Sequence, residues 1–262
     1  MNASEFETLR FEVSDGIATI TLDRPPLNLI DSLLIEEYLG ALDKADADQA
    51  VKVIVLAGTG KGLSAGVDIK FMRDFDEQAM AQFVQRFYVD QVKRVRSLKK
   101  PIIAAVHGFA REGACTMAFS CDMVLAADDA SFGYPGVPNL AAPPGMHVWH
   151  LQRLLGRMKA AELILTGEPI SAIEAERLGM ITRVVPRADL SSATRALAAK
   201  LAKLSPRALR VTRDLMYQME SMDFDQVPEV AAAAIASAFA SADSREARQA
   251  FLEKRDPVWS GQ

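Results

Sequence analysis

Short apolar runs separated by amphipathic segments organise the first half of the chain. The runs at 6–13 (FETLRFEV) and 17–22 (IATITL) flank Asp15-Gly16, a dipeptide typical of tight turns, and predict an antiparallel hairpin. Three further apolar runs predict buried strands: VKVIVLAG at 51–58, PIIAAV at 101–106 and MVLAA at 123–127. Strands that alternate with helical segments predict one α/β sheet system instead of separate all-α and all-β domains.

Helical periodicity marks two segments between these runs. Residues 31–45 (DSLLIEEYLGALDKA) place leucines at helical spacing after Asp31, a residue type that caps helix starts. Residues 76–98 carry one apolar stripe made of Met80, Phe83, Val84, Phe87 and Val95. We expect this stripe to face the hydrophobic core.

Helices dominate after about residue 143, where ITRVV at 181–185 is the remaining strand signal. Residues 158–167 and 171–180 each predict a helix that ends at or near a glycine. Three more helical segments complete the chain, at 205–219, 226–241 and 244–255.

This helical tail predicts a division of the chain. We expect residues 1–200 to form the α/β core and residues 201–262 to form a helical subdomain packed on the core or reaching beyond it. The alanine-rich helix at 226–241 fits two environments, a subunit-facing surface or burial within the same chain.

Composition and charge narrow the classes of function. Half of the 262 residues are hydrophobic and 24% are charged, the profile of a soluble globular protein. A net charge of −4 argues against nucleic acid as a partner, because phosphate backbones require a concentrated basic surface. The amino-terminal MNASEFETLR lacks the basic and apolar regions of a secretory signal. The apolar run VAAAAIASAFASA is too short to cross a bilayer of about 30 Å, so no membrane partner is expected.

The chain has two cysteines, Cys115 and Cys121. They provide neither a disulfide framework nor metal-ligand spacing. We therefore expect no metal, a cytoplasmic location, and core positions for both thiols.

Two glycine-bearing loops are the candidate anion sites. The first, GTGKGLSAGVD at 58–68, lacks the Gly-Lys-Ser/Thr of a phosphate loop. Its Gly60-x-Gly62-x-x-Ala65 spacing fits a relaxed dinucleotide pattern, but an amphipathic helix stands where that fold needs a second strand with an acidic end. The second loop contains Glu112-Gly113-Ala114. Each loop presents backbone amides just before a helix start, and two such amides converging on one oxygen would form an oxyanion hole.

Together the loops resemble the signatures of the crotonase superfamily, the enoyl-CoA hydratase/isomerase family. GKGLSAGVDIKFM is similar to FxAGxDI, and KPIIAAVHGFAREGACTMAFSCDMVLAADDASFGYP is similar to KPxIAAxxGxAxGGGxxLAxxCDxxxAxxxAxFG. The resemblance extends from the hairpin to the terminal AFLEKRDPVWSG. It implies a crotonase-like ββα spiral core with a C-terminal helical trimerisation subdomain, assembled as a homotrimer or a dimer of trimers.

The resemblance also implies the chemistry. Family members stabilise a thioester enolate with two backbone amides, which by motif position belong here to Val67 and Gly113. The segment Ala65, Asp68 and Ile69 resembles the one that receives the adenine of coenzyme A, and Lys254 would meet its phosphates across a subunit boundary. The expected partner is an acyl-CoA thioester, as in fatty acid metabolism. Coenzyme A would arrive as part of the substrate, with no permanently bound cofactor.

The usual acid/base residues are replaced. Hydratases of the family use two glutamates, and Thr116 and Gly136 stand in their places. Pro144 occupies the position of the aspartate that many isomerases carry. A glycine at the Gly136 position also occurs in the naphthoate synthase branch, where bicarbonate supplies the missing base. The bulky Tyr134 and Trp149 would suit a reshaped acyl pocket.

Glu112, Tyr134 and His147 are the candidate replacements, each with a structural alternative. Glu112 could reach the acyl group or could merely place a favourable charge at a helix start. His147 and the nearby His150 could transfer protons or could cap and pack. Tyr134 could donate a proton or line the pocket. For His107 we expect a structural hydrogen bond.

The leading hypothesis is therefore an enoyl-CoA hydratase/isomerase-like enzyme, a lyase or isomerase, that uses an enolate and non-standard acid/base residues. A second hypothesis is ring-closing or ring-cleaving chemistry like that of the naphthoate synthase branch. A third is a non-catalytic acyl-CoA-binding protein, because both glutamates are absent.

Overall fold

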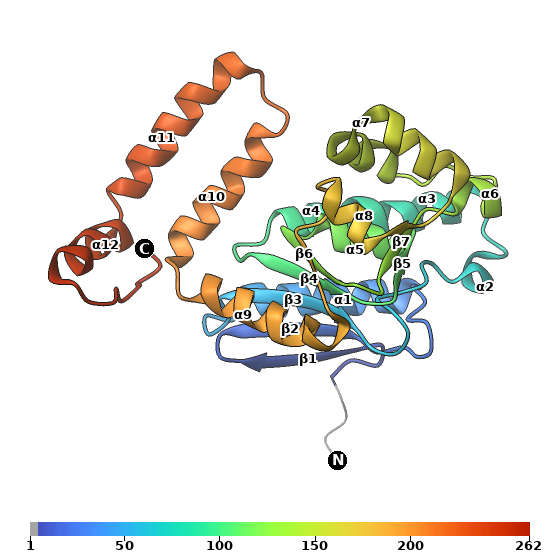
Figure 1. Cartoon of the computed structure of the whole chain (residues 1–262), viewed down its shortest axis with the longest axis horizontal. Helices are drawn as coiled ribbons and strands as arrows, with labels where there is room; N and C mark the ends of the chain where they lie inside the picture. Colours follow the sequence, from blue (N-terminus) through green and yellow to red (C-terminus); the bar gives the residue numbers. More distant parts are fainter. Residues whose placement is uncertain (1–4) are drawn as a thin grey trace.

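Two sheets form the centre of the protein (Figure 1), a computed structural model that describes residues 5–262. The stretch assessed for a secretory signal begins with residues 1–4, which lie outside the described part. The larger sheet has the order β1-β2-β3-β4-β6-β9. Its strands are β1 (Leu9–Ser14), β2 (Ile17–Leu22), β3 (Val53–Gly58), β4 (Ile102–Val106), β6 (Met123–Ala127) and β9 (Arg183–Val185). The smaller sheet contains β5 (Phe109–Arg111), β7 (Ser131–Gly133) and β8 (Ile170–Ser171).

The predicted hairpin is confirmed. Strands β1 and β2 pair antiparallel from Leu9↔Leu22 to Ser14↔Ile17. The turn residues Asp15 and Gly16 both have positive φ, 52° and 76°, as a two-residue hairpin turn requires. All other pairings in the larger sheet are parallel, which explains why its central strands are apolar without alternation.

Helices cover both faces of the larger sheet. On one face lie α1 (Ser32–Ala47), α4 (Gln91–Arg96) and α5 (Gly113–Ser120), and on the other lies α9 (Leu190–Ala202). Alternate residues of β3 enter the two cores, Ile54 and Leu56 on the α1 side and Val53 and Val55 on the α9 side. The predicted cap of α1 is confirmed, because the Asp31 side chain accepts a hydrogen bond from the Leu34 amide at 3.0 Å.

The apolar stripe of residues 76–98 is confirmed only in part. The segment consists of α3 (Glu77–Val84), a π-helical turn (Gln85–Asp90) and α4. Phe83, Phe87 and Val95 are buried, but Met80 and Val84 are each 36% exposed. A π-helical turn contains more residues than an α-helical turn. The buried positions therefore do not follow the constant α-helical spacing from which the stripe was predicted.

The middle of the chain departs from its predicted boundaries. Helix α7 (His147–Thr166) begins earlier than the predicted helix at 158–167 and is kinked at Gly156, whose φ is 73°. The predicted helix at 171–180 is α8 (Ala172–Arg177). The predicted strand at 181–185 is the short β9, and β8 had no clear sequence signal. Two further short helices are α2 (Ile69–Met72) and α6 (Gly136–Leu140).

The last three helices form an arm that stands away from the sheets (Figure 1): α10 (Pro206–Met219), α11 (Val227–Phe239) and α12 (Ala242–Glu253). All of α11 is described and none of its residues is buried. Burial of the alanine-rich helix within its own chain is therefore the wrong alternative. Ile235 and Phe239 remain 66% and 61% exposed. This arrangement supports our proposed division of the chain near residue 200.

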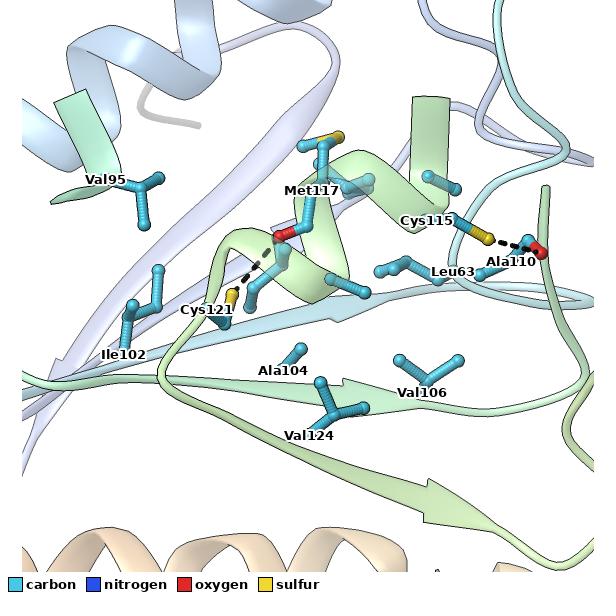
Figure 2. Packing of buried hydrophobic residues seen from close by; sticks show 14 of the residues in the cluster. Leu63, Val95, Ile102, Ala104, Val106, Ala110, Cys115, Met117, Cys121 and Val124 are labelled. Carbon is cyan, nitrogen blue, oxygen red and sulfur yellow. Dashed lines mark hydrogen bonds between the residues drawn. The ribbon is translucent and has the colours of Figure 1, made fainter. Parts of the chain in front are cut away.

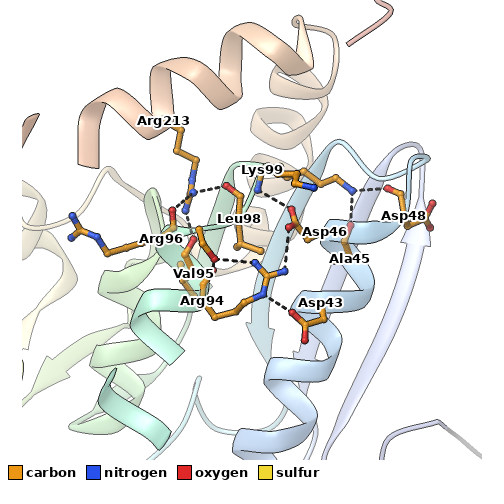
Figure 3. A network of polar contacts seen from close by, with 12 residues as sticks. Asp43, Ala45, Asp46, Asp48, Arg94, Val95, Arg96, Leu98, Lys99 and Arg213 are labelled. Carbon is orange, nitrogen blue, oxygen red and sulfur yellow. Dashed lines mark hydrogen bonds and ion pairs between the residues drawn. The ribbon is translucent and has the colours of Figure 1, made fainter. Parts of the chain in front are cut away.

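One buried arginine attaches the arm to the core (Figure 3). Arg213 of α10 donates to the carbonyl oxygens of Val95, Arg96 and Leu98 at 2.5 to 2.9 Å. Its Nε also forms an ion pair with Asp122 at 2.8 Å. The arm is thus held to the end of α4 and the loop that follows it by charge-assisted hydrogen bonds.

Both cysteines are core residues, as predicted (Figure 2). Cys115 Sγ lies 3.2 Å from the Ala110 carbonyl oxygen, and Cys121 Sγ lies 3.3 Å from that of Met117. Burial raises the pKa of the Cys115 thiol to about 12. Neither thiol pairs in a disulfide, and the protonated, buried Cys115 is a packing residue.

Candidate active site

The two glycine-bearing loops run side by side in parallel register. A β-bridge pairs Ser64 with Ala110. Around it, the Leu63 amide donates to the Phe109 carbonyl at 2.9 Å, and the Arg111 amide donates to the Ser64 carbonyl at 3.1 Å. Further along, a Cβ built on Gly66 would lie 3.0 Å from the Arg111 carbonyl oxygen and 3.5 Å from Glu112 Cβ. The residues that precede Val67 and Gly113 are therefore neighbours in space.

The amide of Val67 points away from its own strand partner. Val67 forms a parallel bridge with Ile30, in which the Ile30 amide donates to Gly66 and the Asp68 amide donates to Ile30, at 2.9 and 2.8 Å. Successive amides of an extended segment point in opposite directions, so the Val67 N–H faces the other side. Within residues 5–262 it donates no hydrogen bond.

Gly113 supplies a second free amide. It is the first residue of α5, where backbone N–H groups have no partner inside the helix. No described residue accepts a hydrogen bond from it. A Cβ at this position would lie 2.8 Å from Phe87 Cε1 and 3.1 Å from Ile30 Cδ1, so the residue is packed tightly against the core.

Glu112 precedes Gly113 in an unusual conformation, with φ 43° and ψ −108°. Its amide donates to the Gly133 carbonyl at 2.9 Å, and its own carbonyl accepts from the Thr116 amide at 3.1 Å. Its carboxylate forms no capping bond to α5 and instead accepts a hydrogen bond from the Gly136 amide. Gly136 is the first residue of α6, so the carboxylate meets the start of that helix, and a favourable charge at a helix start stays an alternative to catalysis.

His147 and Thr116 form a buried polar pair beneath Glu112. His147 Nε2 lies 2.8 Å from Thr116 Oγ1 and 3.1 Å from the Glu112 carbonyl oxygen. A hydrogen bond to the carbonyl would need the hydrogen on Nε2, whereas a hydrogen bond donated by the Thr116 hydroxyl would need Nε2 without it. Burial lowers the pKa of His147 to about 3, so the imidazole is neutral near pH 7. Its Nδ1 is buried without a partner among the described residues.

Two tyrosines complete the cluster. The Tyr134 ring lies 4.5 Å from the His147 ring, and the Tyr88 ring lies 6.4 Å from it. Burial raises the pKa of both phenols, and the Tyr134 hydroxyl has no partner in the described part of the chain. Sequence reasoning missed Tyr88, whose only signal was its place beside Phe87 in the helical segment.

The segment expected to receive coenzyme A lies at one end of the molecule. Ala65 follows Ser64 beside β5, and the Asp68 side chain caps α2 by accepting from the Lys70 amide at 2.9 Å. Ile69, the first residue of α2, is 59% exposed. Lys254 follows α12 at the opposite end of the molecule (Figure 1), so one chain does not bring it to this segment.

The other histidines and Trp149 make contacts of their own. His107 Nε2 makes its expected structural contact, 3.1 Å from the Gly60 carbonyl oxygen. His150 and Trp149 line a different cavity of about 270 Å³ between α4, α5, α7 and α10. The expected reshaped acyl pocket around Tyr134 and Trp149 stays a prediction, because Tyr134 lies against His147 and Trp149 lines this cavity.

Comparison with known proteins identifies the family. The Enoyl-CoA hydratase/isomerase family profile matches residues 12–262. The chain belongs to this family. A probable enoyl-CoA hydratase from Bacillus subtilis is 36% identical over 252 residues, covering 95% of this chain and 97% of the relative. A short-chain-enoyl-CoA hydratase from Clostridium acetobutylicum is 32% identical over 255 residues, covering 96% and 97%. A crystal structure of an enoyl-CoA hydratase from Bacillus anthracis aligns with a TM-score of 0.92 at 29% identity, covering 98% and 100%.

This enoyl-CoA hydratase/isomerase family member thus has the crotonase fold that its two loop signatures predicted. It is an acyl-CoA enzyme of the hydratase/isomerase class. Among the residues described, no group of three or more His, Cys, Asp or Glu side chains could hold a metal ion. No helix in residues 5–262 has the length and apolar character of a membrane span.

The buried neutral His147 predicts acid sensitivity. Its folded pKa of about 3 lies below the ordinary 6.5, so between these values the unfolded chain binds more protons than the folded one. The free energy of unfolding should therefore be about 2 kcal/mol lower at pH 4.5 than at pH 6.5. Urea unfolding at both pH values should show a smaller loss in His147→Gln than in the parent protein. Equal losses in the two proteins would contradict the assignment.

Proposed function

We propose that this family member binds an acyl-CoA thioester and stabilises its enolate with the amides of Val67 and Gly113. The observation that supports this most directly is that the two amides follow adjacent segments of loops that run side by side and that neither donates elsewhere among the described residues. Two preorganised donors aimed at one oxygen stabilise charge that develops there during reaction. The pair is therefore the expected oxyanion hole.

A thioester is the acyl group that such a site serves best. Its carbonyl is weakly stabilised by resonance, so its α-carbon can lose a proton when the oxygen is held by donors. A free carboxylate would enter already charged and gain little from the same donors. We therefore propose that coenzyme A enters as part of the substrate and that no permanently bound cofactor takes part.

We base the proposed placement of coenzyme A on the exposed start of α2. We propose that Ala65, Asp68 and Ile69 border the adenine and that Lys254 of a second copy approaches the phosphates. The exposed apolar side chains of the arm, such as Phe251 and Leu252, support assembly as a homotrimer or a dimer of trimers. A cytoplasmic location fits this activity.

The three functional hypotheses differ in what happens to the α-proton. The engaged Glu112 carboxylate supports an active enzyme over a silent binder, because it places an acid/base group at the site. Relatives named as enoyl-CoA hydratases support an unsaturated acyl chain over a cyclic one. Hydration, isomerisation and ring chemistry would share the same enolate.

One assay tests the enolate directly. Butanoyl-CoA incubated with the protein in deuterated buffer should exchange its α-hydrogens, as measured by NMR or mass spectrometry. Crotonyl-CoA offered in parallel reports hydration, which we expect to be slower than in family members that keep both glutamates. Butanoyl-CoA that raises the melting temperature without any α-exchange would instead identify a binding protein.

A further inference from the structure

We infer that the Glu112 carboxyl group is the acid/base catalyst of this enzyme and that it occupies the volume vacated by the missing side chain at Gly136. This inference rests on the proposed enolate function, and it assigns the residue that moves the proton. It also accounts for how the chain could remain active without glutamates at positions 116 and 136.

The position of the carboxylate carries the inference. A Cβ built on Gly136 would lie 2.9 Å from Glu112 Oε1 and 3.5 Å from Glu112 Cδ. The Gly136 amide donates a hydrogen bond to the same oxygen. The carboxyl group therefore lies directly against the place where a side chain at position 136 would begin. A glutamate at 136 and the present carboxylate cannot both fit there without movement, so the two replacements are complementary.

The backbone of Glu112 is held in a conformation that glycine adopts more easily. Its φ of 43° with ψ of −108° is rare for a residue with a Cβ, and the family signature has glycine at this position. Backbone hydrogen bonds to Gly133 and Thr116 and the contact with His147 Nε2 fix both ends of the residue. Backbone strain that surrounding contacts hold in place in this way is typical of functional sites. His147 acts here as a positioning residue.

The carboxyl group is also accessible and suitably basic. Glu112 is half-buried, and its Oε2 has no hydrogen-bond partner among the described residues and is not sealed from solvent. Burial raises its pKa above the ordinary value, which strengthens it as a base. Its side chain starts one peptide unit before the Gly113 amide. A thioester held by that amide would present its α-carbon to this part of the site.

The proton transfer is balanced without another reactant. Glu112 Oε2 takes a proton from the α-carbon, and the electron pair of the broken C–H bond forms the enolate, whose oxygen is held by the Val67 and Gly113 amides. The protonated carboxyl group then returns the proton, or one exchanged with solvent, to carbon. The enolate collapses to the thioester and the carboxylate is regenerated.

Three variants test the assignment with the butanoyl-CoA exchange assay. Glu112→Gln keeps an acceptor for the Gly136 amide and should slow exchange at least ~100-fold, because general acid–base catalysis typically contributes 10² to 10⁴-fold. Glu112→Gly should be equally slow while keeping or raising the melting temperature, since glycine relieves the backbone strain. The double variant Glu112→Gly with Gly136→Glu returns a carboxylate to the same volume and should regain at least ~10-fold over Glu112→Gly.

The outcomes separate this inference from the proposed function. Exchange by the parent protein together with near-parental exchange by Glu112→Gln would overturn the role of Glu112 and leave the enolate function standing. A folded double variant with no recovery would overturn the shared-volume argument. A parent protein that binds butanoyl-CoA without exchange would remove the enolate function, and the inference with it.

Discussion

Replacing Gly113 by proline is expected to slow α-proton exchange about 10² to 10³-fold, because proline has no amide hydrogen to donate to the enolate oxygen. Position 113 is the first residue of α5, where helices tolerate proline, and the proline ring additionally restricts the backbone of Glu112 before it, so thermal unfolding must accompany the assay. Butanoyl-CoA exchange and thermal unfolding of the variant measure the effect. Binding of the thioester should weaken far less than exchange.

Gly113→Ala is the matched control. Alanine and proline both add a Cβ, which would approach Phe87 Cε1 at 2.8 Å and force a small adjustment of that ring. Alanine retains the amide hydrogen, so its loss of exchange reports the packing change alone. A much larger loss in the proline variant than in the alanine variant is the expected result. Equal losses would mean that the Gly113 amide does not stabilise the enolate.

Replacing Arg213 by alanine should destabilise the protein by about 3 to 5 kcal/mol, the range for breaking a buried ion pair. The Arg213 side chain is 5% exposed and pairs with Asp122 at 2.8 Å. Its removal would leave Asp122 without its cationic partner, with hydrogen bonds from the Tyr217 hydroxyl and the Ile102 amide remaining, and would remove a donor from the carbonyls of Val95 and Leu98. Urea unfolding measures the change at a fixed protein concentration.

Arg210 provides the control on the same helix. It lies 3.8 Å from Asp214 with both side chains more than half exposed, a pair that contributes at most about 1 kcal/mol. Arg210→Ala should therefore change stability little. Because Arg213 attaches α10 to the core, its alanine variant should also weaken the proposed homotrimer or dimer of trimers in sedimentation experiments. A stable, normally assembled Arg213→Ala protein would show that the arm is held by other contacts.

Local pattern was enough to predict the elements whose side chains alternate or repeat regularly. The hairpin around Asp15-Gly16, the cap at Asp31 and the buried central strands follow from turn chemistry, capping and uninterrupted apolar runs. The stripe of residues 76–98 was harder, because one π-helical turn changes the phase without a sequence signal. The loop motifs further indicated the family, which the match over residues 12–262 confirms.

By itself the sequence determined the fold and the family. Only the tertiary structure decided how the site is filled. The Glu112 carboxylate reaches Gly136, 24 residues away, and His147 reaches Thr116, 31 residues away. Periodicity and motif spacing specify the faces of local elements, whereas these contacts depend on how separate loops and helices pack and on side-chain direction. The positive φ of Glu112, which sets that direction, becomes visible only when the two loops lie side by side.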